Sequence, residues 1–235
     1  MKKITILTHQ GLGDIIICNS IIRNYSKKYD KVYVITPMNN YSNTVYMYRD
    51  LLNVEVIHIE WSELINIYHN NDYFSNYLKK YNIENSDIIR IGFENCQKQF
   101  FDEGFYNQIN LDFNKRWSDF YIERDNNREM KLFNSLNLKE NDYILINNQS
   151  SSGKINIPFI KNIINTEKRI IYTDKLTDNI FDWCYIIENA TEIHTICSAF
   201  KHLMDSLNLN KCEKLVYYTI KSNNFTKSKN NWIYV

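Results

Sequence analysis

The sequence begins with the β-branched run ITILT at residues 4–8, which is followed by HQGLGD at residues 9–14. An apolar-patterned stretch, IIICNSIIRNYSKKY, then occupies residues 15–29. The first run predicts a buried strand, the two glycines predict a tight turn, and the spacing of isoleucines in the third part predicts a helix. A strand, a glycine turn and a helix in this order are typical of the first half of a βαβ unit.

Further β-branched runs recur along the chain, at intervals that leave room for helices. The first group of predicted strands lies at residues 32–36, 54–59 and 87–93, and the second group at 143–148, 169–173, 193–196 and 215–219. Between the later strands, FIKNII at 159–164 and SAFKHLMDSL at 198–207 predict helices. Strands that alternate with helices favour parallel sheets, so the chain is predicted to be an α/β protein.

The two groups of strands are separated by the segment NKRWSDFYIERD, which predicts a connection between two small domains. We expect an N-terminal domain at residues 1–105 and a C-terminal domain at 106–235 that includes the linker. With 235 residues, the chain is long enough for two such units.

Composition excludes several classes of protein. Hydrophobic residues make up 44% of the chain, which is ample for a packed core and unlike a disordered segment. The 28 basic and 27 acidic residues leave a formal charge of +1, too small for the broad positive surface of a dedicated nucleic-acid binder. We therefore expect no nucleic-acid partner.

Cysteine usage and the N-terminus indicate the expected compartment. The five cysteines are widely spaced and include neither a CxxC pair nor a metal-ligand spacing, so reduced thiols and no bound metal are expected. The apolar run at the N-terminus breaks after four residues, which is too short for a signal peptide or a transmembrane segment. These features predict a cytoplasmic protein without a transmembrane segment.

The first candidate site is the loop containing Gln10, Gly11, Gly13 and Asp14, which follows the first predicted strand. Ligands of open parallel sheets bind at the carboxyl ends of strands, and glycine allows another molecule to approach the backbone closely. Position 16 is Ile16, so the third glycine of a dinucleotide fingerprint is missing and a dinucleotide oxidoreductase is disfavoured.

Asp14 has two interpretations. It is either the N-cap of the helix that follows, which would stabilise the helix by roughly 1 kcal/mol, or a general base that deprotonates an acceptor hydroxyl. One geometry cannot be optimal for both roles, so a capping hydrogen bond would count against catalysis.

The second candidate site, NNQSSSGK at residues 147–154, follows the first strand of the second group. The hydroxyl of Ser152, the backbone amides near Gly153 and the charge of Lys154 suit a phosphate or diphosphate. A Walker loop would need glycine at position 148, which is Asn148, so an ATPase is rejected. An ordinary polar loop is the alternative.

The third candidate site lies in IIENATEIHTICSAFKHLMDSL, where a strand leads through a tight turn into a helix that starts near Ser198. The amides of a helix N-terminus attract an anion, although Ser198 is equally well explained as a simple cap. His194 is a candidate donor-site residue, with packing inside the strand as the alternative.

The N-terminal pattern ITILTHQGLGDIIICNSIIRNY and the segment IIENATEIHTICSAFKHLMDSL together resemble the heptosyltransferase-like branch of the GT-B glycosyltransferases. The linker FNKRWSDFYIERD also resembles that of short relatives. The resemblance implies two small Rossmann-like domains facing across a cleft, with the acceptor on the first and a nucleotide-sugar donor on the second. Asp14 then corresponds to the base, Ser198 to the diphosphate-binding helix start and Lys154 to a basic donor-site group.

This resemblance implies a transferase that moves a sugar from a nucleotide sugar to a glycan or other hydroxyl acceptor, with no cofactor. The sequence has no Asp-x-Asp pair to hold a metal on the diphosphate, which favours a metal-independent enzyme. Cys197 departs from the acidic residue of many relatives at that position. Two other functions stay open: a catalytically inactive glycan- or nucleotide-binding module, and a sugar-nucleotide hydrolase or epimerase.

Overall fold

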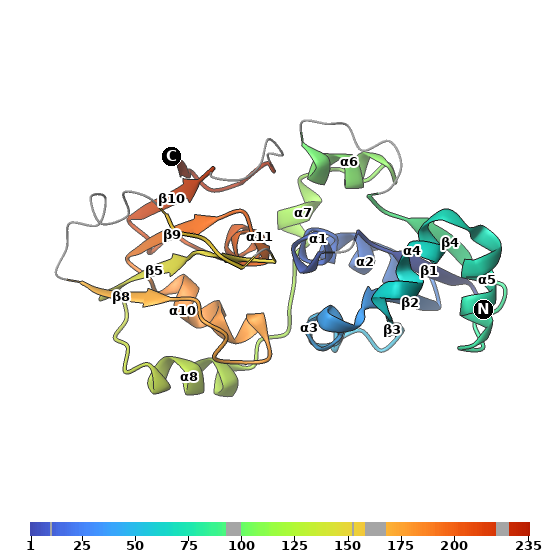
Figure 1. Cartoon of the computed structure of the whole chain (residues 1–235), viewed down its shortest axis with the longest axis horizontal. Helices are drawn as coiled ribbons and strands as arrows, with labels where there is room; N and C mark the ends of the chain where they lie inside the picture. Colours follow the sequence, from blue (N-terminus) through green and yellow to red (C-terminus); the bar gives the residue numbers. More distant parts are fainter. Residues whose placement is uncertain (10, 93–99, 152, 158–167, 220–225) are drawn as a thin grey trace. The chain divides into compact units, whose positions relative to one another are not determined.

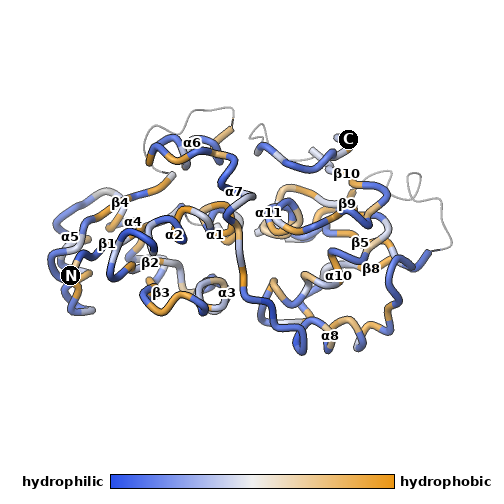
Figure 2. Tube along the Cα trace, turned by 180° about the vertical axis from the view of Figure 1, so that it is seen from behind, coloured by the Kyte–Doolittle hydropathy of each residue, from blue (hydrophilic) through white to orange (hydrophobic). Residues whose placement is uncertain are grey.

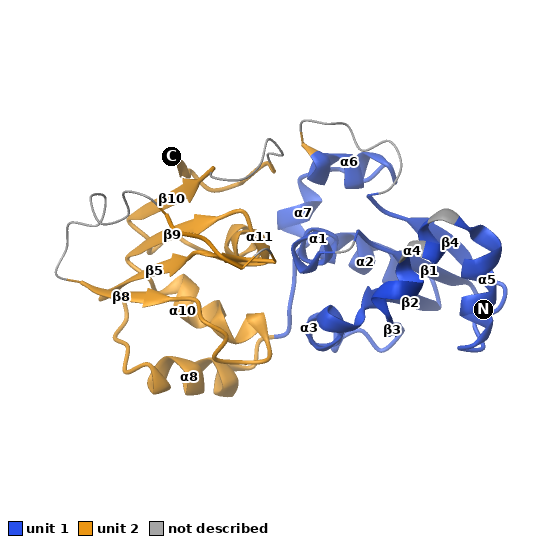
Figure 3. Cartoon of the chain, viewed as in Figure 1, with its two compact units in different colours: residues 1–97, 101–123 blue, residues 98–100, 124–235 orange. Residues whose placement is uncertain are grey.

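The computed structural model describes residues 1–9, 11–92, 100–151, 153–157, 168–219 and 226–235. The chain divides into two compact units (Figures 1 and 3). Unit 1 comprises Met1–Gln97 and Phe101–Glu123, and unit 2 comprises Lys98–Phe100 and Arg124–Val235.

Unit 1 is built on a four-stranded parallel sheet. Its strands are β1 (Lys3–Leu7), β2 (Lys31–Pro37), β3 (Val54–Ile59) and β4 (Asp87–Arg90), in the spatial order β3-β2-β1-β4. The fully buried run of β2 and the buried end of β1 explain their apolar composition, because both faces of a central parallel strand are covered.

The helices of unit 1 connect and cover these strands. They are α1 (Leu12–Ile17), α2 (Asn19–Ser26), η1 (Met38–Asn40), α3 (Tyr41–Tyr48), α4 (Trp61–His69), α5 (Asn71–Lys79), α6 (Phe101–Asn107) and α7 (Lys115–Ser118). One part of the core packs the ends of β1, β2 and β3 against α4 and α5, with Leu7, Ile35, Ile59, Leu64 and Phe74 among its buried residues.

Two predicted elements differ in detail. The helix expected over residues 15–29 is two helices, because the backbone leaves helical geometry at Cys18, where φ is −79° and ψ is 2°. The strand expected over 87–93 ends at Arg90 in the structure, and Gly92 follows with a φ of 92° that only glycine adopts readily.

The expected boundary at residue 105 is corrected, since residues 106–123 belong to unit 1. The Tyr106 hydroxyl is hydrogen-bonded to Ser20 and donates to the carbonyl of Ile17, each at 2.7 Å. Further along, Arg23 donates to the carbonyl of Tyr121 at 2.9 Å. These bonds attach the predicted linker to α1 and α2, where sequence pattern alone gave no anchor.

Unit 2 contains a five-stranded parallel sheet in the order β11-β10-β9-β5-β8. Its strands are β5 (Tyr143–Asn147), β8 (Arg169–Tyr172), β9 (Glu192–Ile196), β10 (Lys214–Tyr218) and β11 (Ile233–Tyr234). A separate antiparallel hairpin pairs β6 (Gln149–Ser150) with β7 (Gly153–Lys154). One side of the core joins Ile144, Ile146, Ile196, Val216 and Tyr218.

The described helices of unit 2 are α8 (Asn126–Ser135), η2 (Ile180–Trp183), α10 (Cys184–Glu188) and α11 (Ala199–Ser206). In Figure 2, α8 carries both hydrophobic and hydrophilic residues, and its buried face includes Leu132 and Phe133. The helix predicted at 159–164 lies outside the described residues.

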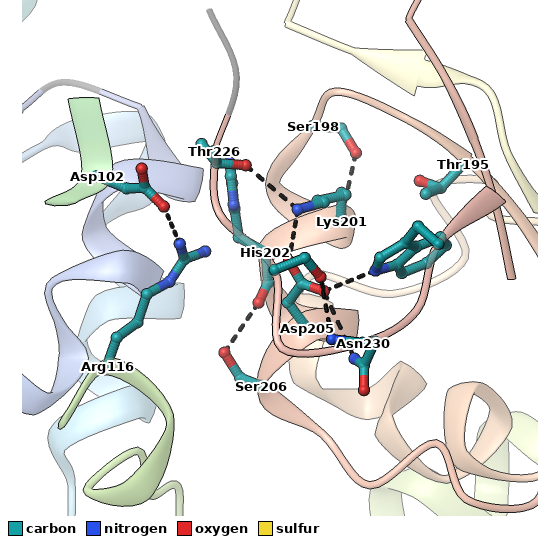
Figure 4. A network of polar contacts seen from close by, with 12 residues as sticks. Asp102, Arg116, Thr195, Ser198, Lys201, His202, Asp205, Ser206, Thr226 and Asn230 are labelled. Atoms are coloured by element: carbon teal, nitrogen blue, oxygen red, sulfur yellow. Dashed lines mark hydrogen bonds and ion pairs between the residues drawn. The ribbon is translucent and has the colours of Figure 1, made fainter. Parts of the chain in front are cut away.

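A buried polar network ties the C-terminal segment to α11 (Figure 4). Asp205, which is fully buried, accepts hydrogen bonds from Lys201 and Ser228, and from the Trp232 indole nitrogen at 2.8 Å. The Lys201 ammonium also donates to the Thr226 hydroxyl at 3.2 Å. Two side chains of α11, Asp205 and Lys201, therefore hold the segment 226–232 against that helix.

Both units thus have strands and helices in alternation around a parallel sheet, and the predicted α/β fold class is confirmed.

Candidate functional sites at the strand ends of each unit

The first cluster lies where β1 ends and α1 begins. The helix starts at Leu12, so Gly11 is its N-cap and Asp14 is its third residue, not the N-cap considered from sequence. Gly13 lies between them as the second helical residue. Of the four predicted loop residues, the structure brings Gly11 and Asp14 into direct contact, and Gln10 lies outside the described residues.

Two donors converge on one oxygen of Asp14. The backbone amide of Gly11 donates to Oδ2 at 3.1 Å, and Nδ1 of His9 lies 2.9 Å from the same atom. The Gly11 contact is a capping hydrogen bond, as the structural interpretation of Asp14 predicts, and it occupies Oδ2. Among the described residues, none is hydrogen-bonded to Oδ1. The two donors thus engage only one of the two carboxylate oxygens.

Glycine at position 11 leaves room for this contact. A Cβ added there would lie 2.9 Å from Asp14 Oδ2, closer than ordinary van der Waals contact. Close approach of the carboxylate to the backbone, and not an unusual φ, explains this glycine, because Gly11 has a φ of −79°.

From the sequence, His9 was considered only as an acid/base residue of a hydrolase or epimerase, and its contact with Asp14 was not predicted. Its ring packs near Phe105 of α6, with ring centroids 6.3 Å apart. A Cβ at Gly92 would lie 3.0 Å from the Cβ of His9 and 2.7 Å from Phe105. The side chain of His9 stays 44% exposed, against 16% for Asp14.

The hydrogen bond to Asp14 raises the pKa of His9 above its ordinary value, and the negative charge of Asp14 adds to this, while burial opposes both. A carboxylate has no proton to donate, so Nδ1 of His9 carries the shared hydrogen.

The second cluster lies at the carboxyl ends of three strands of unit 2. Asn147, at the end of β5, is fully buried and donates to Ser198 Oγ at 2.6 Å and to Thr195 Oγ1 at 3.0 Å. The oxygen of its side-chain amide, Oδ1, accepts from Thr173 Oγ1 at 2.8 Å. The hydrogen bonds of Asn147 were not predicted from the sequence, because its three partners are far away in the chain.

Ser198 caps α11, as its alternative interpretation predicted. Its hydroxyl accepts from the Lys201 amide at 3.4 Å and from Asn147, and the side chain is half-buried. Capping and anion binding are compatible here, because the other first-turn amides of a helix remain without intrahelical partners. The first-turn lysine, Lys201, is buried and engaged with Asp205.

Lys154 lies on the exposed hairpin. Its ammonium is 3.8 Å from Asp174 Oδ1 and 5.3 Å from the ring centroid of Tyr172, at the end of β8. Gln149 donates to the same Asp174 oxygen at 3.0 Å. Gly153, the first residue of β7, has a φ of 99°, which a residue with a side chain would adopt only with strain. Ser152 lies outside the described residues.

The structure does not support a donor-site role for His194. It is fully buried, Nδ1 is hydrogen-bonded to the Tyr218 hydroxyl at 2.9 Å, and Nε2 is 3.2 Å from Glu192. Burial lowers the pKa of His194, with Glu192 opposing the change. Both ring nitrogens are used inside the sheet, so the strand-packing interpretation holds.

Within the described ranges, no three His, Cys, Asp or Glu side chains gather as metal ligands would. In the same part of the chain, no helix has the length and apolar character needed to cross a membrane.

The fold matches those of solved glycosyltransferases. A family 9 glycosyltransferase from Veillonella parvula aligns over 100% of this chain and 86% of its own, with a TM-score of 0.64 and 10% identity. Heptosyltransferase II of Escherichia coli aligns over 99% and 90%, with a TM-score of 0.53 and 12% identity. E. coli WaaC with ADP-2-deoxy-2-fluoro heptose aligns over 99% and 92%, with a TM-score of 0.53 and 10% identity.

No protein-family model and no curated protein sequence matches this chain. At these low identities the structural likeness shows the fold: the chain has the α/β fold of these transferases.

Proposed function

We propose that this protein is a metal-independent glycosyltransferase that moves a sugar from a nucleotide-sugar donor to a hydroxyl of a glycan or other acceptor. The observation that carries the proposal is the Asp14 carboxylate, whose Oδ2 is held by Gly11 and His9 at the strand end of unit 1. The transferase fold, and the nucleotide sugar bound to one of its solved members, support the donor class.

In the proposed reaction, the acceptor hydroxyl oxygen forms a bond to the anomeric carbon, and the bond from that carbon to the diphosphate breaks. The hydroxyl proton passes to Oδ1 of Asp14, and the electron pair of the broken bond leaves with the nucleotide diphosphate. Base catalysis of this kind contributes about 10²- to 10⁴-fold. The loop with Gln10, Gly11 and Gly13 is assigned to the acceptor.

The leaving diphosphate is assigned to unit 2. The Ser198 start of α11 offers amides, and the hairpin with Gly153 and Lys154 offers a cation. These groups would neutralise the developing charge in place of a metal ion. Asn147 supports this site by fixing the Ser198 hydroxyl from β5.

A binding module without chemistry is the second candidate. The observation in its favour is the Gly11–Asp14 capping hydrogen bond, which a purely structural carboxylate would also make. A panel of nucleotide sugars tests both functions: a ligand at 100 times its dissociation constant adds about 2.7 kcal/mol of stability, and product formation then separates transferase from module.

Lys154→Ala is expected to weaken nucleotide-sugar binding about tenfold, because an ammonium that pairs with a diphosphate contributes about 1.4 kcal/mol or more. The fold should be unaffected, since Lys154 is 59% exposed and its nearest carboxylate is 3.8 Å away. Isothermal titration calorimetry measures the effect. The exposed Lys139 of the same unit provides the control variant Lys139→Ala, and equal affinities for the two variants would remove Lys154 from the site.

Asn147→Ala is expected to lower the free energy of unfolding by about 1–3 kcal/mol, because the buried hydroxyls of Thr195, Ser198 and Thr173 would lose a shared partner. Urea denaturation measures the loss. A change below about 0.5 kcal/mol would show that these hydroxyls find other partners.

A further inference from the structure

His9 lies between β1 and α1, beside the proposed base, and it has contacts on more than one side. Nδ1 of His9 lies 2.9 Å from Oδ2 of Asp14, while the rest of the side chain is confined by Gly92 and lies beside the Phe105 ring. The Cβ of any other residue at position 92 would meet both side chains. The surroundings therefore restrict the orientation of the imidazole.

The distribution of donors on Asp14 gives this histidine a role. A carboxylate in a turn can rotate and offer either oxygen, but here Gly11 N and His9 Nδ1 both occupy Oδ2. Two donors on one oxygen fix the plane of the carboxylate and direct Oδ1 away from the pair. An orientation fixed before substrate binds does not have to be selected during the reaction.

We propose that His9 is a positioning residue for Asp14, holding Oδ2 so that Oδ1 meets the acceptor hydroxyl. This inference rests on the proposed glycosyl transfer and deepens it. His9 does not receive the proton in this scheme; its Nδ1–H acts only through Asp14.

The charge of His9 adds a pH dependence. The described residues beside it include Asp14 from α1, the uncharged Phe105 ring from α6, and Gly92 after β4, and Asp14 raises its pKa. While His9 is an imidazolium, its positive charge opposes the transfer of a proton to Asp14. As the pH rises through the pKa of His9, the ring becomes neutral but still donates Nδ1–H, so transfer is expected to increase.

Two substitutions separate positioning from mere packing. His9→Ala removes the donor, and kcat is expected to fall about 10-fold while donor affinity is kept. His9→Asn places an amide N–H near the position of Nδ1, so it should recover most of the activity that His9→Ala loses. The Asn side chain cannot titrate, so the limb of the kcat–pH profile that follows His9 should disappear.

His58→Asn is the matched control, because His58 lies on β3 beside Tyr41 and outside this cluster. Its kcat–pH profile between about pH 6 and about pH 9 should equal that of the wild type. Nuclear magnetic resonance titration of the His9 ring adds a readout that does not need activity: its pKa should fall in Asp14→Asn, since the group that raises it is neutralised.

The outcomes are distinguishable. If the wild type transfers sugar but His9→Ala is as active, or His9→Asn rescues nothing and keeps the pH limb, the positioning role is wrong and the proposed function stands. A His9 pKa that is unchanged in Asp14→Asn also overturns the role, because the pair would then not exist in solution. If the wild type transfers no sugar from any donor it binds, the proposed function fails and the role of His9 fails with it.

Discussion

Asp14→Asn is expected to lower the rate of sugar transfer by about 10²- to 10⁴-fold and to leave donor binding intact. The amide keeps the shape of the carboxylate, and its oxygen can still accept from Gly11 and His9, but it cannot take the proton of the acceptor hydroxyl. Steady-state kinetics with a donor and acceptor from the ligand panel measure kcat, and calorimetry measures donor affinity.

The structural interpretation of Asp14 predicts the opposite result. The side-chain oxygen of asparagine can accept from the Gly11 amide as the carboxylate does, so a purely structural residue would give a variant of near-normal stability and activity. Asp72→Asn is the matched control, because Asp72 is an exposed first-turn aspartate of α5 in the same unit. Turnover of Asp14→Asn within a few-fold of the wild type would falsify the catalytic assignment and favour the binding module.

The second large effect is expected for Asp205→Ala, which should lower the free energy of unfolding of unit 2 by about 3–5 kcal/mol. The substitution leaves the buried Lys201 ammonium without its carboxylate and removes the acceptor of Ser228 and Trp232. Because small domains are stable by only about 5–15 kcal/mol, much of that stability would be lost. Urea denaturation followed by tryptophan fluorescence measures the change.

Asp178→Ala is the matched control, since Asp178 also pairs with a basic residue, Arg128, but is 79% exposed. An exposed pair of this kind contributes about 0–1 kcal/mol. Adding Lys201→Met to Asp205→Ala should restore part of the loss, because the unpaired charge is then gone. Equal effects of Asp205→Ala and Asp178→Ala would show that the buried network does not hold the C-terminal segment.

Two features could not be predicted from the sequence: the boundary between the two units and the environment of His194. For His194, the sequence left a donor-site role and packing inside the strand open, and the structure supplies Tyr218 of the adjacent strand as its partner. Residues 106–123 looked like a linker, yet Ser20 and Arg23 bind them to unit 1. In both cases the deciding contact comes from a residue at least 24 positions away.

Local sequence patterns were sufficient to predict the alternation of strands and helices, the parallel sheets, and the positions of Asp14 and Ser198 near the starts of helices that follow strands. These features depend on side-chain periodicity, glycine and helix-start preferences, which act between residues close in the chain. Contacts between distant parts of the chain are seen only in the folded structure: Asn147 joins Thr173, Thr195 and Ser198, and Asp205 accepts from Ser228 and Trp232. Such pairings depend on which side chains packing brings within hydrogen-bond distance, and no local pattern in the sequence encodes them.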